Sequence, residues 1–365
     1  MISDWRESRL AASFASFAFS PGVIFHLFVV VTIFFPLGGA SQAQSTANAT
    51  WSVTIVLPPR VVAGRPATLA VFGADGKLVS GVTVEVAKDQ RVMTDTTGRA
   101  IFMAPTDGDV VIAKASGKAA AALVDPDGLA SGSQTITVAS IISLKDSFSI
   151  CGGGFRGEAD ANRIKINEER ALILAASPEC LIVLPGPRVR PGPASISIQT
   201  GEERWTATTR VVSLEFEPPQ PPLVPEKKSK LVVRAEGTEQ PLRIVAENQT
   251  PGVLGFERGD VQNLRTSGGA NNFAAIEVQA FRSGDFSFHA RLLPPPDVAV
   301  AERYLRAALP LAPRELQQQL KKLADRLVRH PHDAEKVRRG LQQIISTTIA
   351  GDLRTLLESA DAAFQ

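Results

Sequence analysis

The sequence is short of the side chains that carry most catalytic and metal chemistry. Its 365 residues include two cysteines, four histidines and one tyrosine. So few thiols and imidazoles leave little material for a zinc site or a Ser-His-Asp triad, and no Gly-x-Ser-x-Gly elbow is available to hold a nucleophile. We therefore expect no catalytic residues, no metal site and no cofactor, although two carboxylates that meet only in the folded chain would escape this argument.

The sequence also lacks an excess of charge of either sign. Lysine and arginine total 39 and aspartate and glutamate total 37, which leaves a formal net charge of +2. A protein that holds nucleic acid through its overall field needs a clear positive excess, so we expect no nucleic-acid partner. At roughly 100 to 150 residues per domain, the length predicts two to four domains.

Long apolar runs are missing except in residues 1–43, which have the pattern of a signal peptide. Residues 23–37 are almost entirely apolar, and Ser41-Gln42-Ala43 is suited to cleavage. The run is shorter than the roughly 20 residues that span a bilayer. We predict an exported protein, periplasmic or extracellular at the cell surface. The alternative is an uncleaved N-terminus that anchors the chain to a membrane.

Residues 51–125 predict a β-sandwich, because short alternating runs are separated by turns every eight to twelve residues or so. The motifs are Asp75-Gly76-Lys77, the alternating run 79–86, and 94–102, which reads Thr-Asp-x-x-Gly-x-Ala-x-Phe. This set resembles bacterial Ig-like modules of the invasin type and the related carboxypeptidase-regulatory-like domains. The resemblance implies an Ig-like sandwich at about 51–124 and says almost nothing about function.

Residues 134–217 form a second predicted β unit. A strand is followed by Gly-x-Gly-Phe at 152–155, a second strand at 182–185 and a late Pro-Gly followed by alternating residues at 191–198. This order resembles an IPT/TIG domain, which implies a second Ig-like sandwich. The stretch 168–180 departs from that pattern.

Cys151 and Cys180 are the only cysteines and both lie in the second unit. An exported chain meets an oxidising compartment, so we predict a disulfide between them. A reactive thiol is the alternative, and it would need a base beside it.

A proline-rich run at 218–226 predicts a stiff spacer before a third β-rich domain at 227–293. Within this domain, residues 257–273 read as a long loop of mixed charge, rich in asparagine and glycine. We select it as a possible binding loop, and an ordinary connection is the alternative. Its candidate contact residues are Arg258, Asp260, Arg265, Asn271 and Asn272.

Residues 298–365 change character and predict helices. Leu316, Leu320, Leu323 and Leu327 form one apolar stripe, and Asp333 can cap a second helix after the break at 330–332. We expect these apolar stripes to pack on each other. They would also pack on one of three surfaces: the third β unit, segment 299–309, or a partner chain, which could be a second copy of this chain. Many residues of this hairpin are basic, which would favour binding to an anionic surface. Acidic residues are interleaved with them, so the alternative is an ordinary solvent-exposed helix face.

Together these features predict a mainly β protein, with tandem Ig-like sandwiches followed by a C-terminal α-helical hairpin. We expect a non-catalytic exported envelope protein that serves as a binding, scaffold or adhesion module for an envelope protein or glycan. Binding would use loops at the sandwich ends and exposed strand edges. The alternative is an accessory protein for polysaccharide or peptidoglycan with Trp205 as the glycan platform. An enzyme is the third and weakest reading.

Overall fold

The computed structural model describes residues 53–87, 90–127, 135–217, 219, 223–257 and 259–364. The predicted signal peptide at 1–43, Trp51 and the candidate residue Arg258 lie outside this part of the chain. Within the described residues, no helix combines the length and the apolar character needed to cross a membrane.

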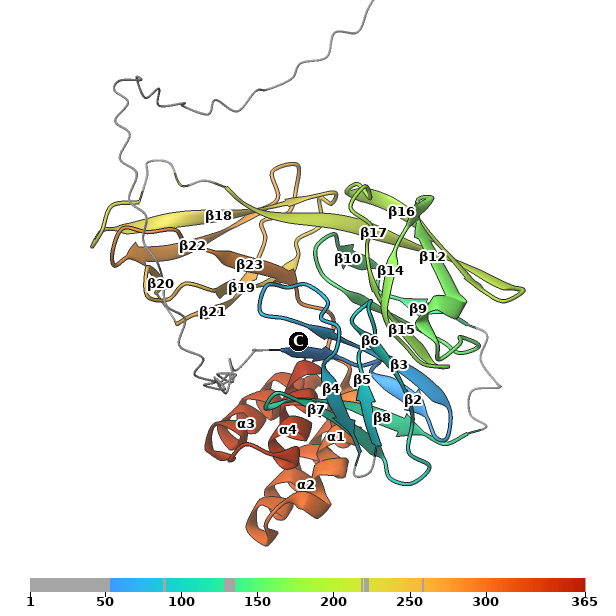
Figure 1. Ribbon diagram of the computed structural model, residues 1–365. Helices are drawn as coiled ribbons and strands as arrows, with labels where there is room; N and C mark the ends of the chain where they lie inside the picture. Colours follow the sequence, from blue (N-terminus) through green and yellow to red (C-terminus); the bar gives the residue numbers. More distant parts are fainter. Residues whose placement is uncertain are drawn as a thin grey trace, which may run out of the picture. The chain divides into compact units, whose positions relative to one another are not determined.

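The first group of strands forms a two-layered sandwich (Figure 1). Its strands are β1 (Thr54–Val56), β2 (Arg60–Val62), β3 (Pro66–Phe72), β4 (Thr83–Val86), β5 (Gln90–Met93), β6 (Arg99–Met103), β7 (Val110–Ala115) and β8 (Lys118–Asp125). One layer contains β1, β3 and β6, and the other has the order β2-β8-β7-β4-β5. Alternate side chains of both layers, among them Leu69, Val84 and Phe102, meet in one buried core.

The turn between β5 and β6 explains the Thr-Asp-x-x-Gly pattern. Asp95 Oδ1 accepts hydrogen bonds from the backbone N–H groups of Thr97, at 2.7 Å, and Arg99, at 3.2 Å. Gly98 has φ +73°, and a Cβ there would lie 2.7 Å from the Cβ of Leu78. Only glycine fits this conformation and this close approach.

Nine strands follow in the second group, and six form the third. The second group contains β9 (Thr137–Val138), β10 (Ile141–Ser143), β11 (Phe148–Cys151), β12 (Asn162–Ile166), β13 (Glu169–Arg170), β14 (Leu172–Ala176), β15 (Cys180–Leu184), β16 (Gly192–Thr200) and β17 (Glu203–Glu217). The third contains β18 (Lys228–Glu236), β19 (Arg243–Asn248), β20 (Leu254–Phe256), β21 (Val261–Arg265), β22 (Phe273–Ala280) and β23 (Phe288–Leu292). Each group has its own buried core.

The sheets continue from one group to the next. Ala176 of β14 pairs with Thr68 of β3, which joins the first and second groups. The 15-residue strand β17 pairs with β16 along one part and with β18 along another (Figure 1). Val211 of β17 lies in the core of the second group, and Val212 lies in that of the third.

The predicted proline-rich spacer at 218–226 lies partly outside the described residues, since 218 and 220–222 are not described. The strands on its two sides, β17 and β18, pair with each other in one sheet, with Ser213 opposite Glu236 and Glu217 opposite Val232.

Four helices follow, where the sequence predicted a hairpin: α1 (Val298–Ala308), α2 (Arg314–Arg329), α3 (Ala334–Thr347) and α4 (Asp352–Ala362). The break at 330–332 lies between α2 and α3, as predicted. Asp333 is at the N-cap of α3 but makes no capping hydrogen bond, because its carboxylate binds Arg326 and Lys336 instead. Gly351 precedes α4 and separates it from α3.

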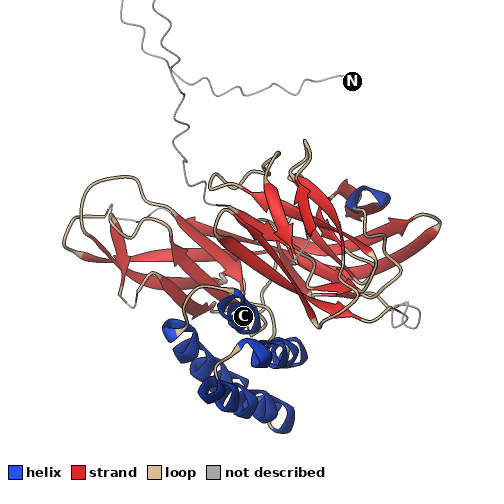
Figure 2. Cartoon of the chain, turned by 60° about the horizontal axis from the view of Figure 1, so that its bottom comes forward, coloured by secondary structure: helices blue, strands red, loops and turns tan. Residues whose placement is uncertain are grey.

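The helices pack on one another, with α1 in contact with both α2 and α4, which confirms the predicted alternative that they pack on segment 299–309. The β unit in their buried cluster is the first, and not the third unit that was another of the predicted alternatives. Their buried side chains form one cluster with Leu123 of β8, against which Val110 and Ile112 of β7 also pack. Tyr304 of α1 donates a hydrogen bond to the carbonyl of Ala121 at 3.1 Å. The reason lies in β7: Val111 and Ala113 pack in the sandwich core, and Val110 and Ile112 pack against the helices. The helices lie together beside the strands in Figures 1 and 2.

Candidate functional site

A polar hollow of about 710 Å³ lies where β17 and β18 meet the turn between β18 and β19. Its charged lining balances, with Arg210 and Arg234 against Glu236 and Glu239. Gly237, Thr238, Gln240 and Ala270 complete the wall. A hollow with no net charge and many hydrogen-bonding groups suits a neutral polar ligand better than an ion.

Gly237 brings the β18–β19 turn close to β17. It has φ +91°, and a Cβ on it would lie 2.4 Å from the carbonyl oxygen of Val211. Arg210 Nη1 donates to the carbonyl of Gly237 at 3.0 Å. Arg234 is held by an ion pair with Glu217 across β17 and β18. The two arginines are therefore positioned by the sheet before any ligand arrives.

Part of the predicted binding loop is clamped onto this turn. The Asn272 side chain is only 1% exposed, and its Nδ2 donates to the carbonyls of Thr238 at 3.2 Å and Gln240 at 2.8 Å. Its Oδ1 accepts from the N–H of Gly268 at 2.8 Å. Asn272 thus has a structural role in shaping the wall of the hollow, and both donors of its amide are already used.

The other candidates in this segment are spread out. Residues 257–273 are not one long loop, because β21 lies within them and pairs with β19. Asp260 precedes that strand, and its backbone carbonyl accepts a hydrogen bond from the backbone N–H of Asn248. Arg265 is the last residue of the strand and lies opposite Arg243 of β19. Asn271 is exposed next to Ala270, which lines the hollow. Arg258 lies outside the described residues.

Phe273 is a residue that the sequence analysis did not select. It pairs with Arg234 across β18 and β22, so both side chains lie on the same face of the sheet, and its side chain is 41% exposed. The alternation of β22 contains the signal, because Ala274, Ile276 and Val278 take the buried positions and leave Phe273 on the outside. An exposed aromatic ring beside a polar hollow is the usual arrangement for stacking on a sugar.

Trp205 has a different environment from the open glycan platform expected for it. It lies on β17 and is half-buried. Its ring is edge-on to Phe155, with 5.7 Å between ring centroids, and a Cβ on Gly154 would lie 3.2 Å from the indole. The Gly-x-Gly-Phe turn and Trp205 therefore pack together over the core of the second unit.

Cys151 and Cys180 form the predicted disulfide. They lie directly opposite each other on β11 and β15. Among the described residues no cysteine is free. The alternative of a reactive thiol is therefore wrong for this state of the chain.

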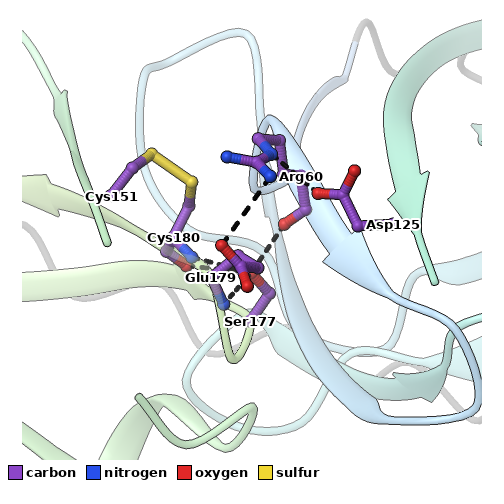
Figure 3. Close-up of a disulfide and its surroundings, with 6 residues drawn as sticks. All are labelled: Arg60, Asp125, Cys151, Ser177, Glu179 and Cys180. Atoms are coloured by element: carbon purple, nitrogen blue, oxygen red, sulfur yellow. Dashed lines mark hydrogen bonds and ion pairs between the residues drawn. A yellow bond between two sulfur atoms is a disulfide. The ribbon is translucent and has the colours of Figure 1, made fainter. Parts of the chain in front are cut away.

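A buried ion-pair cluster lies next to the disulfide (Figure 3). Asp125, at the end of β8, binds Arg60 at 2.7 Å and Arg303 of α1 at 2.8 Å. Arg60 also lies 3.8 Å from Glu179, and burial raises the pKa of that carboxyl group. The Ser177 hydroxyl donates to the carbonyl of Arg60 at 2.6 Å. Each carboxylate has an arginine partner, so the cluster joins the first unit, the second unit and the helices.

Three of the four histidines lie in the described part of the chain. His289 is half-buried, and its Nε2 lies 3.0 Å from Asp146 Oδ1. This contact is the main cause of the raised pKa of His289. His330 and His332 lie edge-to-face at 5.7 Å. In the described ranges, no group of three or more histidine, cysteine or acidic side chains is placed to hold a metal ion.

No model of a known protein family matches the sequence, and no curated protein matches it. Parts of the chain are similar to solved structures. The extracellular region of plexin A4 is 12% identical over 69% of this chain and 24% of that chain, with a TM-score of 0.25. The four N-terminal Ig domains of Dscam1 are 11% identical over 64% and 73% of the two chains, with a TM-score of 0.20.

A glucan-utilisation protein from Bacteroides ovatus, solved with a mixed-linkage heptasaccharide, is 11% identical over 64% of this chain and 59% of its own, with a TM-score of 0.18. This chain thus spans about a quarter of the plexin chain and less than two thirds of the Bacteroides protein. Because these TM-scores are low, the description of the fold rests on the sheets and the buried cores of the chain itself. The predicted fold class is confirmed: the chain is mainly β, with tandem Ig-like sandwiches followed by helices.

Proposed function

We propose that this chain is a non-catalytic, exported scaffold of the cell envelope that binds a protein or glycan at the ends of its sandwiches. The observation that carries the proposal is the strand β17, whose neighbouring residues Val211 and Val212 lie in two different cores. A strand shared by two cores fixes their relative direction, which is what a scaffold needs and what a flexible linker cannot provide.

Within this proposal the first sandwich is an invasin-type or carboxypeptidase-regulatory-like module and the second is an IPT/TIG module. Two glycine positions support the assignment: Gly98 in the turn before β6, and Gly154 under the Trp205 ring. Both are motif positions at which a side chain would meet backbone or ring atoms. Neither module type implies a reaction, and the buried carboxylates Asp125 and Glu179 are held by arginines rather than open to a substrate.

The disulfide supports the exported location, because such bonds persist in oxidising compartments. The test is expression with a C-terminal tag in a diderm bacterium, followed by fractionation and intact-mass measurement with and without reductant. We expect a chain that starts near Gln44 in the envelope or medium, and a mass increase on reduction that corresponds to one disulfide. A full-length cytoplasmic chain with two free thiols would contradict the proposal.

Glycan binding is the second candidate function, and the hollow beside Phe273 favours it. Its balanced charges and exposed ring match the groups that contact neutral sugars. The test is a glycan array with the unmodified chain and with Phe273→Ala and Gln240→Ala. Phe281→Ala is the matched control, since Phe281 is an exposed phenylalanine of the same unit, whereas Phe273 pairs with Arg234 of the lining of the hollow.

We expect Phe273→Ala to weaken a specific glycan signal by about tenfold, the usual order for one stacking contact, while Phe281→Ala leaves the signal unchanged. An equal loss of glycan signal in Phe273→Ala and Phe281→Ala, or the absence of any specific glycan signal, would rule out glycan binding at this hollow. The protein-binding scaffold would then remain as the proposed function. A parallel hydrolase screen tests the absence of catalysis. Activity that disappears with one substituted carboxylate or histidine would overturn that part of the proposal.

A further inference from the structure

The outer side of the α2–α3 pair contains a groove of about 880 Å³, which is lined by aliphatic side chains together with the polar residues Glu315, Gln319, Gln343, Thr347 and Thr348. Leu316 and Leu323 line it from α2, and Ile344 lines it from α3. Leu311, Ile349 and Leu353 close one end. The 16 residues of α2 make the pair about 24 Å long.

The groove exists because the leucine stripe of α2 is only half covered. Leu320 and Leu327 are completely buried against the other helices, whereas Leu316 and Leu323 remain half-exposed in the groove. Ile349, in the turn before α4, is 88% exposed. Together with Leu311 and Leu353, these residues form one aliphatic strip along the groove.

Gly340 lies inside α3 and forms part of the groove. Glycine is unfavourable within a helix, so its presence there needs a reason. A Cβ at this position would lie 3.4 Å from Leu323 Cδ2, which is ordinary contact, so the backbone does not require glycine. Because Gly340 has no side chain, the space between α2 and α3 at this position stays open.

At the other end of the pair, the groove meets a cationic hollow of about 580 Å³. Lys322 lines both. The rest of the hollow is made by the tip of the helical pair: Arg326, Arg329, His330, His332, Asp333 and Lys336. The spacing 322, 326, 329 places these cations on one face of α2, as a continuation of the face that lines the groove.

The hollow has more positive charge than its own acid can neutralise. Asp333 is the one acidic residue in its lining, and it binds Arg326 at 2.7 Å and Lys336 at 3.4 Å. These two contacts lower its pKa, so it stays ionised. Within the described residues Lys322 and Arg329 form no ion pair, and Arg329 donates only to the carbonyl of Asp325.

We propose that this face of α2 and α3 binds a single-chain amphiphile with a phosphate headgroup. The acyl chain lies in the groove over Gly340, and the phosphate is held in the hollow by Lys322 and Arg329. The half-exposed Leu316 and Leu323 lie along the groove and the cations lie in the adjoining hollow, so one continuous surface offers contacts to an acyl chain and to a phosphate. This inference does not depend on the proposed scaffold function.

The experiment titrates the purified chain with monododecyl phosphate below its micelle concentration, using calorimetry. Inorganic phosphate supplies the charge without the chain, and dodecyl maltoside supplies the chain without the charge. We expect saturable one-to-one binding of the phosphate amphiphile at least about tenfold tighter than either partial ligand. Equal affinity for dodecyl maltoside would overturn the proposal.

Two variants separate the ends of the site. Lys322→Glu combined with Arg329→Glu should weaken monododecyl phosphate binding by about tenfold or more and leave dodecyl maltoside unaffected. Gly340→Leu should fill the groove and abolish binding of the chain. The control is Lys227→Glu with Lys230→Glu, two exposed lysines of the third unit that form no ion pair in the described chain. Circular dichroism and the Tm of each variant check that it folds.

Vesicles distinguish a single amphiphile from a membrane surface. Vesicles of phosphatidylcholine with and without phosphatidylglycerol are sedimented with the chain. Strong binding to the anionic vesicles without binding of monododecyl phosphate monomers would overturn the proposal in favour of a flat membrane contact. Binding of the monomers that the control variant retains and both site variants lose would support it.

Discussion

Trp205 shows how the surroundings of one residue decide its role. It is half-buried against Phe155 and Gly154 at the edge of the core of the second unit. Trp205→Ala should therefore lower the free energy of unfolding by about 2 kcal/mol, less than for a fully buried tryptophan. Urea unfolding measures it. If Trp205→Ala instead leaves stability unchanged and removes a glycan signal, the open-platform role first predicted for it is right.

His289 makes the stability depend on pH. Its pKa is raised mainly by the hydrogen bond with Asp146, further by Asp146 and Glu247 as charges, and is opposed by burial and Arg291. A raised folded pKa means that the contribution is complete below the ordinary pKa of about 6.5 and is lost as the pH rises through the folded value.

The expected result is a stability difference between the unmodified chain and His289→Asn that is larger at acid than at alkaline pH. Urea unfolding at several pH values on both sides of the ordinary histidine pKa measures it. His330→Asn is the control, because His330 is exposed and makes no ion pair in the described chain. A difference that grows as the pH rises would show that the protonated histidine does not stabilise the fold.

At the scale of elements, β17 couples two cores. Val211→Ala and Val212→Ala each remove buried methyl groups, one from the second core and one from the third, and each should cost about 2 kcal/mol. Because the strand is shared, both variants should lower the midpoint of one common transition. Differential scanning calorimetry with two separate transitions, each moved by only one variant, would show that the cores unfold independently.

The elements that the sequence predicted well are those with a strong local pattern. Alternation identified strands such as β4, and the leucine stripe with the break at 330–332 identified α2 and α3. The strand β21 was not predicted, because its two apolar residues, Val261 and Leu264, do not fall at alternate positions. The burial of β7 on both faces was also not predicted, since a short apolar run does not say what covers each face.

For the whole molecule, the disulfide closes a segment between residues 29 positions apart. In the chain-entropy model a bridge of this size contributes roughly 3 to 4 kcal/mol, through the unfolded state. Cys151→Ser combined with Cys180→Ser should lower the free energy of unfolding by about that amount. Urea unfolding of oxidised, reduced and substituted chains measures it. A substituted chain as stable as the oxidised one would show that the native contacts of β11 and β15 alone hold this region.

Local chemistry by itself determined much of this protein. Side-chain alternation, turn residues such as Asp95 and Gly98, and the helical periodicity act between neighbours in the chain, so the mainly β class, the helical end and the two cysteines as a pair could be predicted. Only the tertiary structure decided which faces meet. The hollow of Arg210, Arg234 and Ala270, the packing of the helices on β7 and β8, and the cluster of Arg60, Asp125 and Arg303 each join residues that are distant in sequence. Such groupings depend on packing and sheet register between strands, and no local pattern encodes them.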